Sequence, residues 1–205
     1  MDLFNQQIEQ AYYDNIKHYH NELKPAHTRY IQEVSVDYMA VSLECAMFLR
    51  LLCDLVQPQS ILDLGSGFST YVFGMHAPPE CVVWTVDTDN AWLDKTKQFT
   101  ISHGKPVDRY LVWDALIKTT ERFELIFFDI EVTAKRPNFL PPILNHFLTP
   151  TSMIVMDDLH KPHLQDKFKT ILSDYEATQR NITKYTLDKF NRYSTLITEI
   201  SKIQK

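Results

Sequence analysis

Hydrophobic residues in the middle of the chain alternate between short continuous runs and stretches with helical spacing. The continuous runs predict five buried strands, over residues 60–64, 81–87, 109–114, 124–129 and 152–157. The stretches that follow them predict helices over residues 71–75, 91–100, 115–122, 138–147 and 163–176. Nearly continuous apolar strands separated by helices are typical of a parallel sheet that is covered on both faces. We therefore expect an α/β fold with a doubly wound sheet.

The N-terminal part of the chain has a different pattern. Apolar residues at steps of four predict an amphipathic helix over residues 1–22, which Pro25 is expected to end. A second helix with a broad apolar side is predicted over residues 40–56. We divide the chain into a helical N-terminal extension, residues 1–39, and a Rossmann-like domain, residues 40–205.

The C-terminal part contains two extended runs. Residues 183–190 and 192–200 resemble two strands joined by a tight turn, and they predict an antiparallel hairpin that closes one edge of the sheet. Together with the five central strands, this hairpin predicts a seven-stranded sheet that is parallel except for one antiparallel strand.

Composition narrows the range of partners. The 205 residues carry a formal net charge of −5 and contain no long run of lysine or arginine. We therefore expect neither a nucleic-acid nor a membrane partner, because phosphate groups bind to concentrated positive charge. The three cysteines show no metal-ligand spacing, and the first residues lack the layout of a signal peptide. These features predict free thiols and a cytoplasmic protein.

Two of the four glycines of the chain follow directly after the first predicted strand. Gly65 and Gly67 form the turn into the next helix, in the stretch ILDLGSGFST. Glycine is required where the backbone adopts unusual dihedral angles or approaches a ligand closely. In a doubly wound sheet, ligands bind beyond the carboxyl ends of the strands. The turn therefore predicts a ligand site, and the alternative is a tight turn without a ligand.

Aspartates recur at the ends of successive predicted strands. Asp87 lies 22 residues after Gly65, where a carboxylate can accept hydrogen bonds from both ribose hydroxyls. Asp114 ends the third strand and could accept from an adenine amino group. Each acid could instead cap the following helix. An acidic site favours a cationic nucleoside over a pyrophosphate, and Thr70 stands where a nicotinamide enzyme needs the third glycine of its motif.

The segments ILDLGSG, VVWTVDTD, ELIFFD and SMIVMDD, in this order, resemble the class I methyltransferases that use S-adenosylmethionine. The resemblance covers about residues 40–200 and implies S-adenosylmethionine as the cofactor. It assigns the methionine part to Asp63 and the Gly65–Gly67 turn, which includes Ser66. Ser69 or Thr70 would help at its carboxylate. Asp87 would hold the ribose, and the residues around the adenine would be Thr88, Trp113 and Asp114.

Three carboxylates are expected to meet at the ends of the fourth and fifth strands. These residues are Asp129, Asp157 and Asp158, and an oxygen-rich site of this kind suits Mg²⁺. The pattern is similar to small metal-dependent O-methyltransferases of the catechol and macrocin types, in which Mg²⁺ holds adjacent oxygens of the acceptor. The catechol type has a lysine shortly after the first of these acids, whereas Lys135 comes six positions later. Alternatively, the acid pair caps the next helix.

His160 follows this acid pair by two residues and is a candidate general base, with a histidine on a surface loop as the alternative. Asp129 is the second candidate catalytic residue. The resemblance implies that residues before the core build the acceptor pocket, and the candidates there are Tyr12, Tyr13, Tyr19, Tyr30, Tyr38 and Met39.

The function predicted from the sequence is O-methylation of a small hydroxylated acceptor that uses S-adenosylmethionine, with Mg²⁺ as a candidate second cofactor. The expected partner is a small molecule, and a homodimer is compatible with the sequence. Three alternatives stay open: a methyltransferase with another class of acceptor, a Rossmann module that binds the cofactor without turnover, and a nicotinamide oxidoreductase.

Overall fold

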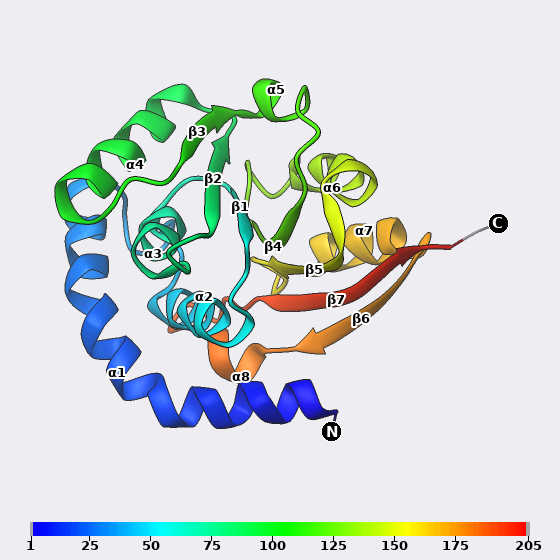
Figure 1. Ribbon diagram of the computed structural model, residues 1–205, viewed down its shortest axis with the longest axis horizontal. Helices are drawn as coiled ribbons and strands as arrows, with labels where there is room; N and C mark the ends of the chain where they lie inside the picture. Colours follow the sequence, from blue (N-terminus) through cyan, green and yellow to red (C-terminus); the bar gives the residue numbers. More distant parts are fainter. Residues whose placement is uncertain (1, 204–205) are drawn as a thin grey trace.

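A seven-stranded sheet forms the centre of the protein (Figure 1), whose computed structural model describes residues 2–203. The strands follow the order β3-β2-β1-β4-β5-β7-β6. They are β1 (Ser60–Leu64), β2 (Val82–Asp87), β3 (Arg109–Val112), β4 (Phe123–Phe128), β5 (Leu148–Met156), β6 (Tyr175–Asn181) and β7 (Thr195–Lys202). Within the described residues, β7 alone runs opposite to the other strands, and it pairs with β5 on one side and β6 on the other. The predicted fold class is therefore confirmed.

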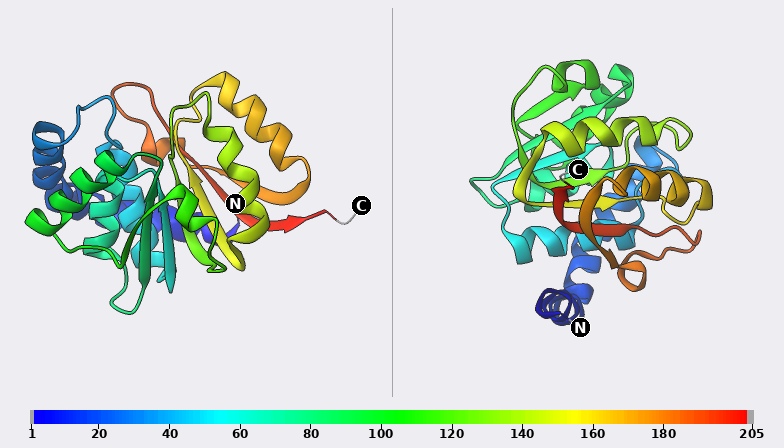
Figure 2. Two further views of the ribbon diagram at one scale, coloured as in Figure 1. Left: turned by 90° about the horizontal axis from the view of Figure 1, so that it is seen from above. Right: turned by 90° about the vertical axis from the view of Figure 1, so that its right-hand side faces the viewer.

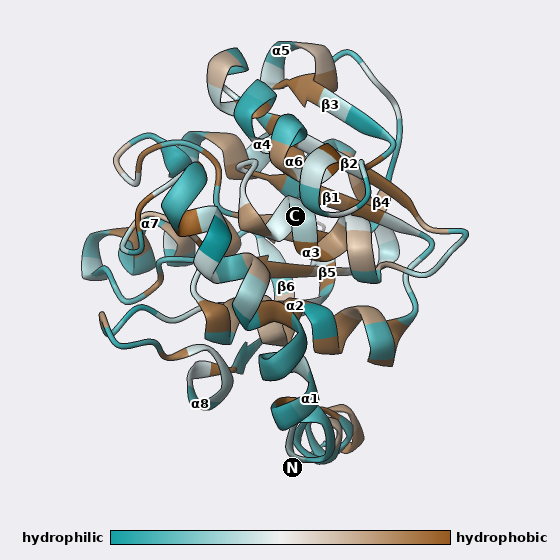
Figure 3. Cartoon of the chain, turned by 90° about the vertical axis from the view of Figure 1, so that its left-hand side faces the viewer, coloured by the Kyte–Doolittle hydropathy of each residue, from teal (hydrophilic) through white to brown (hydrophobic). Residues whose placement is uncertain are grey.

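Helices cover both faces of the sheet (Figure 2). One layer contains α1 (Leu3–Glu33), α2 (Leu43–Val56), α3 (Phe68–His76) and α4 (Asn90–His103), and the other contains α5 (Trp113–Leu116), α6 (Leu140–His146) and α7 (Pro162–Leu172). Successive side chains of a strand point to opposite faces. Thus Ile61 joins the core under the first layer, and Leu62 joins the core under the second. Hydrophobic residues accordingly gather in the central strands (Figure 3).

Helix α1 is longer than the sequence predicts. It continues through Pro25 to Glu33, so the predicted end at the proline is wrong. A proline inside a helix removes one backbone hydrogen bond and costs about 3 kcal/mol. Here the residues on both sides of it are buried in the core shared with α2, including Leu23 and Tyr30. Burial of these side chains offsets the cost, and α1 curves around the first helical layer (Figure 1).

The C-terminal hairpin exists, but its first strand lies earlier than predicted. Strand β6 pairs with β7, whereas the predicted strand 183–190 begins with the short helix α8 (Thr183–Thr186). The predicted helix 163–176 ends at Leu172 for the same reason. Tyr185 of α8 is buried and stacks on Phe48 of α2 at a ring distance of 5.7 Å. The apolar residues of this run therefore pack on a helix and do not pair in the sheet.

The sheet order places the functional candidates. After β1 the chain adds β2 and β3 on one side of β1, and then crosses to form β4 on the other side. The carboxyl ends of β1 and β4 therefore flank the switch point of the sheet.

Across residues 2–203, every helix is too short or too polar to cross a membrane.

Candidate active site

A cavity of about 730 Å³ lies at the carboxyl ends of the central strands. Residues after β1, β2, β4 and β5 line it, together with residues from the end of α1 and from the loops 38–41 and 190–192. Of the residues predicted for the site, the cavity is lined by Gly65, Ser66, Gly67, Ser69, Asp87, Asp129, Asp157, Asp158 and His160. The predicted ligand-binding turn and the predicted acidic group therefore meet in one cavity.

Gly65 is fixed between the two halves of the sheet. Its φ angle is +98°, a region that side chains with a Cβ rarely adopt. Its amide donates to the carbonyl of Val86 at 2.8 Å, and a Cβ at this position would lie 2.5 Å from the carbonyl oxygen of Asp129. The fold itself therefore requires glycine here.

Gly67 has a different surrounding. A Cβ built on it would have Tyr30 Oη, at 3.5 Å, as its only close neighbour, which is an ordinary contact. Tyr30 reaches this place from α1, and its hydroxyl is buried without a hydrogen-bond partner of normal geometry, although it faces the Thr96 hydroxyl. The absence of a side chain at Gly67 thus leaves open space in the cavity beside an unused hydroxyl group.

Asp87 is buried at the end of β2 and organises the glycine turn. Its Oδ2 accepts from the amide and the hydroxyl of Ser66, both at 2.9 Å. Its Oδ1 accepts from the amides of Thr88 at 2.7 Å and Asp89 at 3.1 Å. Burial raises the pKa of Asp87, and these donors oppose the rise. All of its present partners are uncharged, so a ligand hydroxyl can replace the Ser66 hydroxyl without separating an ion pair.

Asp63 lies beneath the turn, fully buried, and outside the cavity lining. Its Oδ2 accepts from the hydroxyls of Thr70 at 2.5 Å and Thr85 at 2.9 Å. The Thr70 hydroxyl in turn accepts from the Gly67 amide at 3.1 Å. Burial raises the pKa of Asp63 to about 7. Asp63 therefore supports the turn through Thr70.

The residues predicted around an adenine lie outside the cavity lining. Strand β3 ends at Val112, before the predicted end, and Trp113 and Asp114 belong to α5. Trp113 packs edge-on against Phe139 at a ring distance of 4.7 Å, and Asp114 is exposed. The Thr88 hydroxyl donates to Glu131 at 2.9 Å. Their contact with an adenine stays a prediction.

Trp92 of α4 was not predicted for the site. It lines the cavity, and its indole N–H donates to the Ser66 carbonyl at 2.6 Å. The contact links α4 to the glycine turn.

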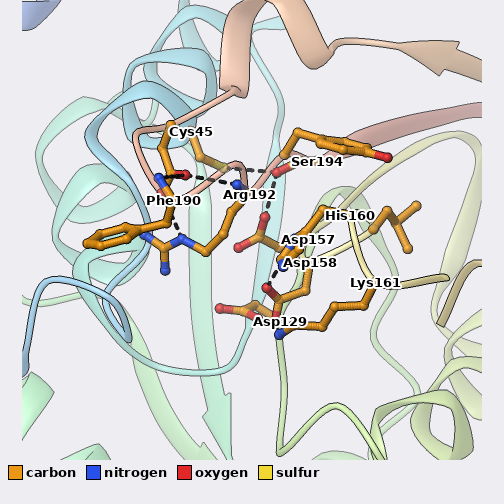
Figure 4. Close-up of polar contacts among 12 residues, drawn as sticks. Cys45, Asp129, Asp157, Asp158, His160, Lys161, Phe190, Arg192 and Ser194 are labelled. Atoms are coloured by element: carbon orange, nitrogen blue, oxygen red, sulfur yellow. Dashed lines mark hydrogen bonds and ion pairs between the residues drawn. The ribbon is translucent and has the colours of Figure 1, made fainter. Parts of the chain in front are cut away.

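The three acids after β4 and β5 point toward one region (Figure 4). Ser194 donates to Asp157 Oδ1 at 2.7 Å and also contacts the Cys45 thiol at 3.4 Å. Lys161 Nζ lies 2.8 Å from Asp158 Oδ2. Burial and the other two carboxylates raise the pKa of Asp129, while Arg136 lowers it. All three acids line the same cavity.

Arg136 is a residue of the site that the sequence pattern did not reveal. It begins the 3-10 helix η1 (Arg136–Phe139), and the whole residue is 5% exposed. Its Nη2 lies 2.6 Å from Asp129 Oδ1, and its Nη1 donates to Asp158 Oδ2 at 3.1 Å. Its Nε and Nη2 donate to the carbonyls of Ile130 and Glu131, each at 3.1 Å. A guanidinium group therefore bridges the two strand ends.

These contacts test the expected magnesium site. Mg²⁺ needs carboxylate oxygens that are free to coordinate it. Here Asp129 and Asp158 already contact Arg136, and Asp158 also contacts Lys161. Across residues 2–203, the histidine, cysteine and acidic side chains form no group of three or more with the arrangement of a metal site. The donor set therefore does not fit a divalent cation.

His160 lines the cavity beside the acids. Its Nδ1 is buried without a hydrogen bond, and Asp158 Oδ1 lies 3.7 Å from it. Burial lowers the pKa of His160, and the nearby Asp158 carboxylate opposes this effect. The imidazole is therefore neutral near pH 7 and able to accept a proton.

The rim of the cavity is partly apolar. Tyr38, Met39, Val132 and Phe190 line it with exposed side chains. Arg192 fastens this rim, because it pairs with Asp188 at 2.7 Å and donates to the carbonyls of Tyr38 and Ala40. Of the N-terminal aromatic residues predicted for the acceptor pocket, Tyr30 and Tyr38 line the cavity, together with Met39. Tyr19 instead donates to Asp54 at 2.7 Å, and Tyr12 packs on Tyr185.

No protein-family model and no curated protein matches the sequence. Solved structures share the fold. The O-methyltransferase TomG from Streptomyces achromogenes, involved in tomaymycin synthesis and solved with S-adenosylmethionine, is 18% identical; the match covers 98% of this chain and 91% of that chain at a TM-score of 0.62. An O-methyltransferase from Bacillus cereus in complex with S-adenosylhomocysteine is 15% identical, with 96% and 91% covered and a TM-score of 0.64.

The methyltransferase PaMTH1 from Podospora anserina, bound to S-adenosylhomocysteine, is 14% identical. The match covers 90% of this chain and 86% of that chain at a TM-score of 0.64. At these identities the likeness shows the fold alone, and this is the fold expected from the resemblance to class I methyltransferases.

Proposed function

We propose that the protein transfers a methyl group from S-adenosylmethionine to a hydroxyl group of a small acceptor. One observation carries the proposal: the glycine turn with Asp87 and the acids with His160 face each other across one cavity. A fold of this kind supports many reactions, so the argument rests on these residues and on the chemistry they can perform.

The residues present fit the proposed cofactor. Gly67 leaves open space, and the Tyr30 hydroxyl beside it is buried without a hydrogen-bond partner of normal geometry, so a carboxylate there would give it an acceptor. Asp87 would hold the ribose hydroxyls. Six acidic residues line the cavity against three arginine or lysine residues, which favours a positively charged ligand. When bound, S-adenosylmethionine supplies an electrophilic methyl group on a sulfonium.

On the other side, the chain's own residues must hold and activate the acceptor. Methyl transfer requires a nucleophilic oxygen, and a hydroxyl group becomes one when a base removes its proton. His160 is the base in this proposal, because its imidazole is neutral and lines the cavity. The apolar rim of Tyr38, Met39 and Phe190 suits an acceptor with an apolar or aromatic body and excludes water from the reacting group.

The proposal assigns no step to Mg²⁺. The expectation of metal assistance rested on three unpaired carboxylates, and two of these carboxylates are paired with Arg136. Asp129 and Asp158 therefore shape the charge of the acceptor side through the arginine that they hold.

Thermal unfolding with three ligands tests the cofactor. S-adenosylhomocysteine at 100 times its dissociation constant stabilises the fold by about 2.7 kcal/mol, which corresponds to roughly 5–10 °C for a chain of this size. NAD⁺ and ATP are expected to leave the melting temperature unchanged. A shift with NAD⁺ alone would instead support the nicotinamide alternative.

Two variants make this experiment specific. Asp87→Ala removes the acceptor for the ribose hydroxyls, and we expect a loss of affinity for S-adenosylhomocysteine of about a hundredfold. Asp94→Asn is the matched control, because Asp94 is an exposed acid of the neighbouring helix α4 that lies outside the cavity lining. Equal affinity in both variants would contradict the role of Asp87. A screen of phenolic acceptors with wild type and His160→Gln then tests the methyl transfer itself.

A further inference from the structure

The acid cluster of the cavity has cationic partners supplied by the chain itself. Arg136 contacts Asp129 and Asp158, and Lys161 contacts Asp158. Asp157 is held by an uncharged donor, Ser194. The two side-chain cations carry together the same charge as one divalent metal ion, and they lie against the carboxylates that were expected to bind it.

The position of Arg136 is tightly determined. Each of its three side-chain nitrogen atoms has a partner, and two of the partners are backbone carbonyls of the loop after β4. Arginine is charged at every pH at which proteins fold, and its planar group can contact two carboxylates at once. A Mg²⁺ ion in the same place would have to displace this group and leave a buried charge without its partners.

We propose that Arg136, assisted by Lys161, takes the place of the divalent cation, so that the site binds its ligands and works without metal. This inference deepens the proposed function and rests on it for its catalytic part, whereas its metal-binding part stands alone. Arg136 is a positioning residue here: it fixes Asp129 and Asp158 and supplies their counter-charge. Because the guanidinium has no open coordination position, the acceptor needs to present only one hydroxyl group, to His160.

The test is a titration with manganese chloride alone, followed by calorimetry and by thermal unfolding. Wild type is expected to show no saturable binding and a change in melting temperature of less than about 1 °C. Arg136→Gln removes the internal cation and leaves the carboxylates together. We expect this variant to gain saturable Mn²⁺ binding, with a rise of roughly 5 °C or more at saturation.

Lys135→Gln is the matched control. Lys135 is the neighbouring cation, its side chain is 67% exposed, and it lies 3.6 Å from Glu131 and outside the cavity lining. This variant is expected to behave like wild type. A structural role of Arg136 alone would lower the stability of Arg136→Gln but would not create metal binding, so the gain of binding separates the two explanations.

Three outcomes overturn the inference. The first is saturable Mn²⁺ binding by wild type that is lost in the Asp158→Asn variant. Such a result would mean that the metal binds Asp158 in place of Arg136. Another is a folded Arg136→Gln variant that binds no Mn²⁺. The third is a loss of affinity for S-adenosylhomocysteine, or of methyl transfer, in wild type treated with EDTA. If Arg136→Gln does not fold, the wild-type measurements still decide. Failure of every variant to bind S-adenosylhomocysteine would refute the proposed function and leave the Mn²⁺ comparison intact.

Discussion

The cavity has two sides whose carboxylates are stabilised by different partners. On the β1–β2 side, Asp87 lines the cavity and Asp63 lies buried beneath it, and both carboxylates accept hydrogen bonds only from hydroxyl groups and backbone amides in the contacts of residues 2–203. On the β4–β5 side, formed by Asp129, Asp157 and Asp158, two of the three carboxylates contact cationic side chains. The same residue type at equivalent strand ends is therefore used in two ways.

The difference indicates what each side can exchange. A hydrogen bond from a neutral donor contributes about 1 kcal/mol and can be replaced by an equivalent bond from a ligand. A buried ion pair is held more firmly, because removing one partner leaves an unpaired charge at a cost of about 3–5 kcal/mol. We infer that the β1–β2 side rearranges around a ligand, while the β4–β5 side stays as a fixed wall.

The largest effect is expected where the two sides touch. Gly65→Ala places a Cβ 2.5 Å from the Asp129 carbonyl at a φ angle of +98°, so both the backbone and the contact are strained. We expect a loss of about 4 kcal/mol in the free energy of unfolding, or no folded protein at all. Urea denaturation measures it.

Gly67→Ala is the control for this substitution. Its Cβ would lie in the cavity with Tyr30 Oη 3.5 Å away, so we expect a loss of stability of about 1 kcal/mol or less. Its affinity for S-adenosylhomocysteine should fall at least about tenfold, since the new methyl group takes space from the ligand. Equal stability losses in the two variants would contradict the distinction between the glycines.

Asp158→Asn tests the fixed wall. The variant removes the negative charge that pairs with two cations, Arg136 and Lys161. Because the Asp158 side chain is only 14% exposed, we expect the variant to lose about 3 kcal/mol of stability. Asp158 has a φ angle of +63°, which asparagine tolerates, so backbone strain does not confuse the result. Asp87→Asn keeps one oxygen that can accept from Ser66, but its amide nitrogen cannot accept from the backbone amides of Thr88 and Asp89, so its loss should be about 1–2 kcal/mol in the same urea titration. Similar losses for both substitutions would remove the contrast between the two sides.

Much of this arrangement could be predicted from the sequence. Continuous apolar runs identify the strands, and an aspartate directly after such a run must lie at the carboxyl edge of a parallel sheet. For that reason the amino-acid pattern alone assigns Asp87, Asp129 and the pair Asp157-Asp158 to one edge. The glycine turn follows from the same argument.

Arg136 and the contact of Tyr30 with the glycine turn could not be predicted, for different physical reasons, although Tyr30 itself was a candidate for the acceptor pocket. Arg136 lies on a short 3-10 helix without a repeating pattern, and its partners are 7 and 22 positions away in the chain. The contact of Tyr30 with the glycine turn depends on α1 continuing past Pro25, which is decided by burial of both halves of the helix against α2. Local propensity points to the opposite outcome there.

A pH experiment sharpens the picture of the β1–β2 side. Burial raises the pKa of Asp63 from 3.8 to about 7 in the folded protein, so the fold favours the protonated acid. Its contribution to stability is present below about pH 4 and is lost as the pH rises to about 7. Asp63→Asn has no such titration, and the stability of wild type relative to this variant should fall by about 2 kcal/mol between pH 5 and 7.

The difference in stability between wild type and Asp63→Asn separates the titration of Asp63 from that of the histidines. Burial lowers the pKa of His27, and it lowers that of His76 to about 4, so these groups make the fold more stable as the pH rises toward 6.5. Both proteins contain them, and their effects cancel in the difference. A difference that stays constant with pH would show that Asp63 is already ionised in the folded state.

The smallest effect is expected at Tyr30, a residue of α1 that lines the cavity beside the glycine turn. Tyr30→Phe removes a buried hydroxyl that has no hydrogen-bond partner of normal geometry and faces only the Thr96 hydroxyl, so the free energy of unfolding should stay about the same. The affinity for S-adenosylhomocysteine should fall about threefold to tenfold, because the ligand loses one hydrogen bond of about 1 kcal/mol. Calorimetric titration measures both proteins, and Tyr13→Phe serves as the control because Tyr13 is an exposed tyrosine of the same helix. If Tyr30→Phe bound the ligand as tightly as Tyr13→Phe, the hydroxyl would have no part in binding, and the β1–β2 side would hold the cofactor through the glycine turn and Asp87 alone.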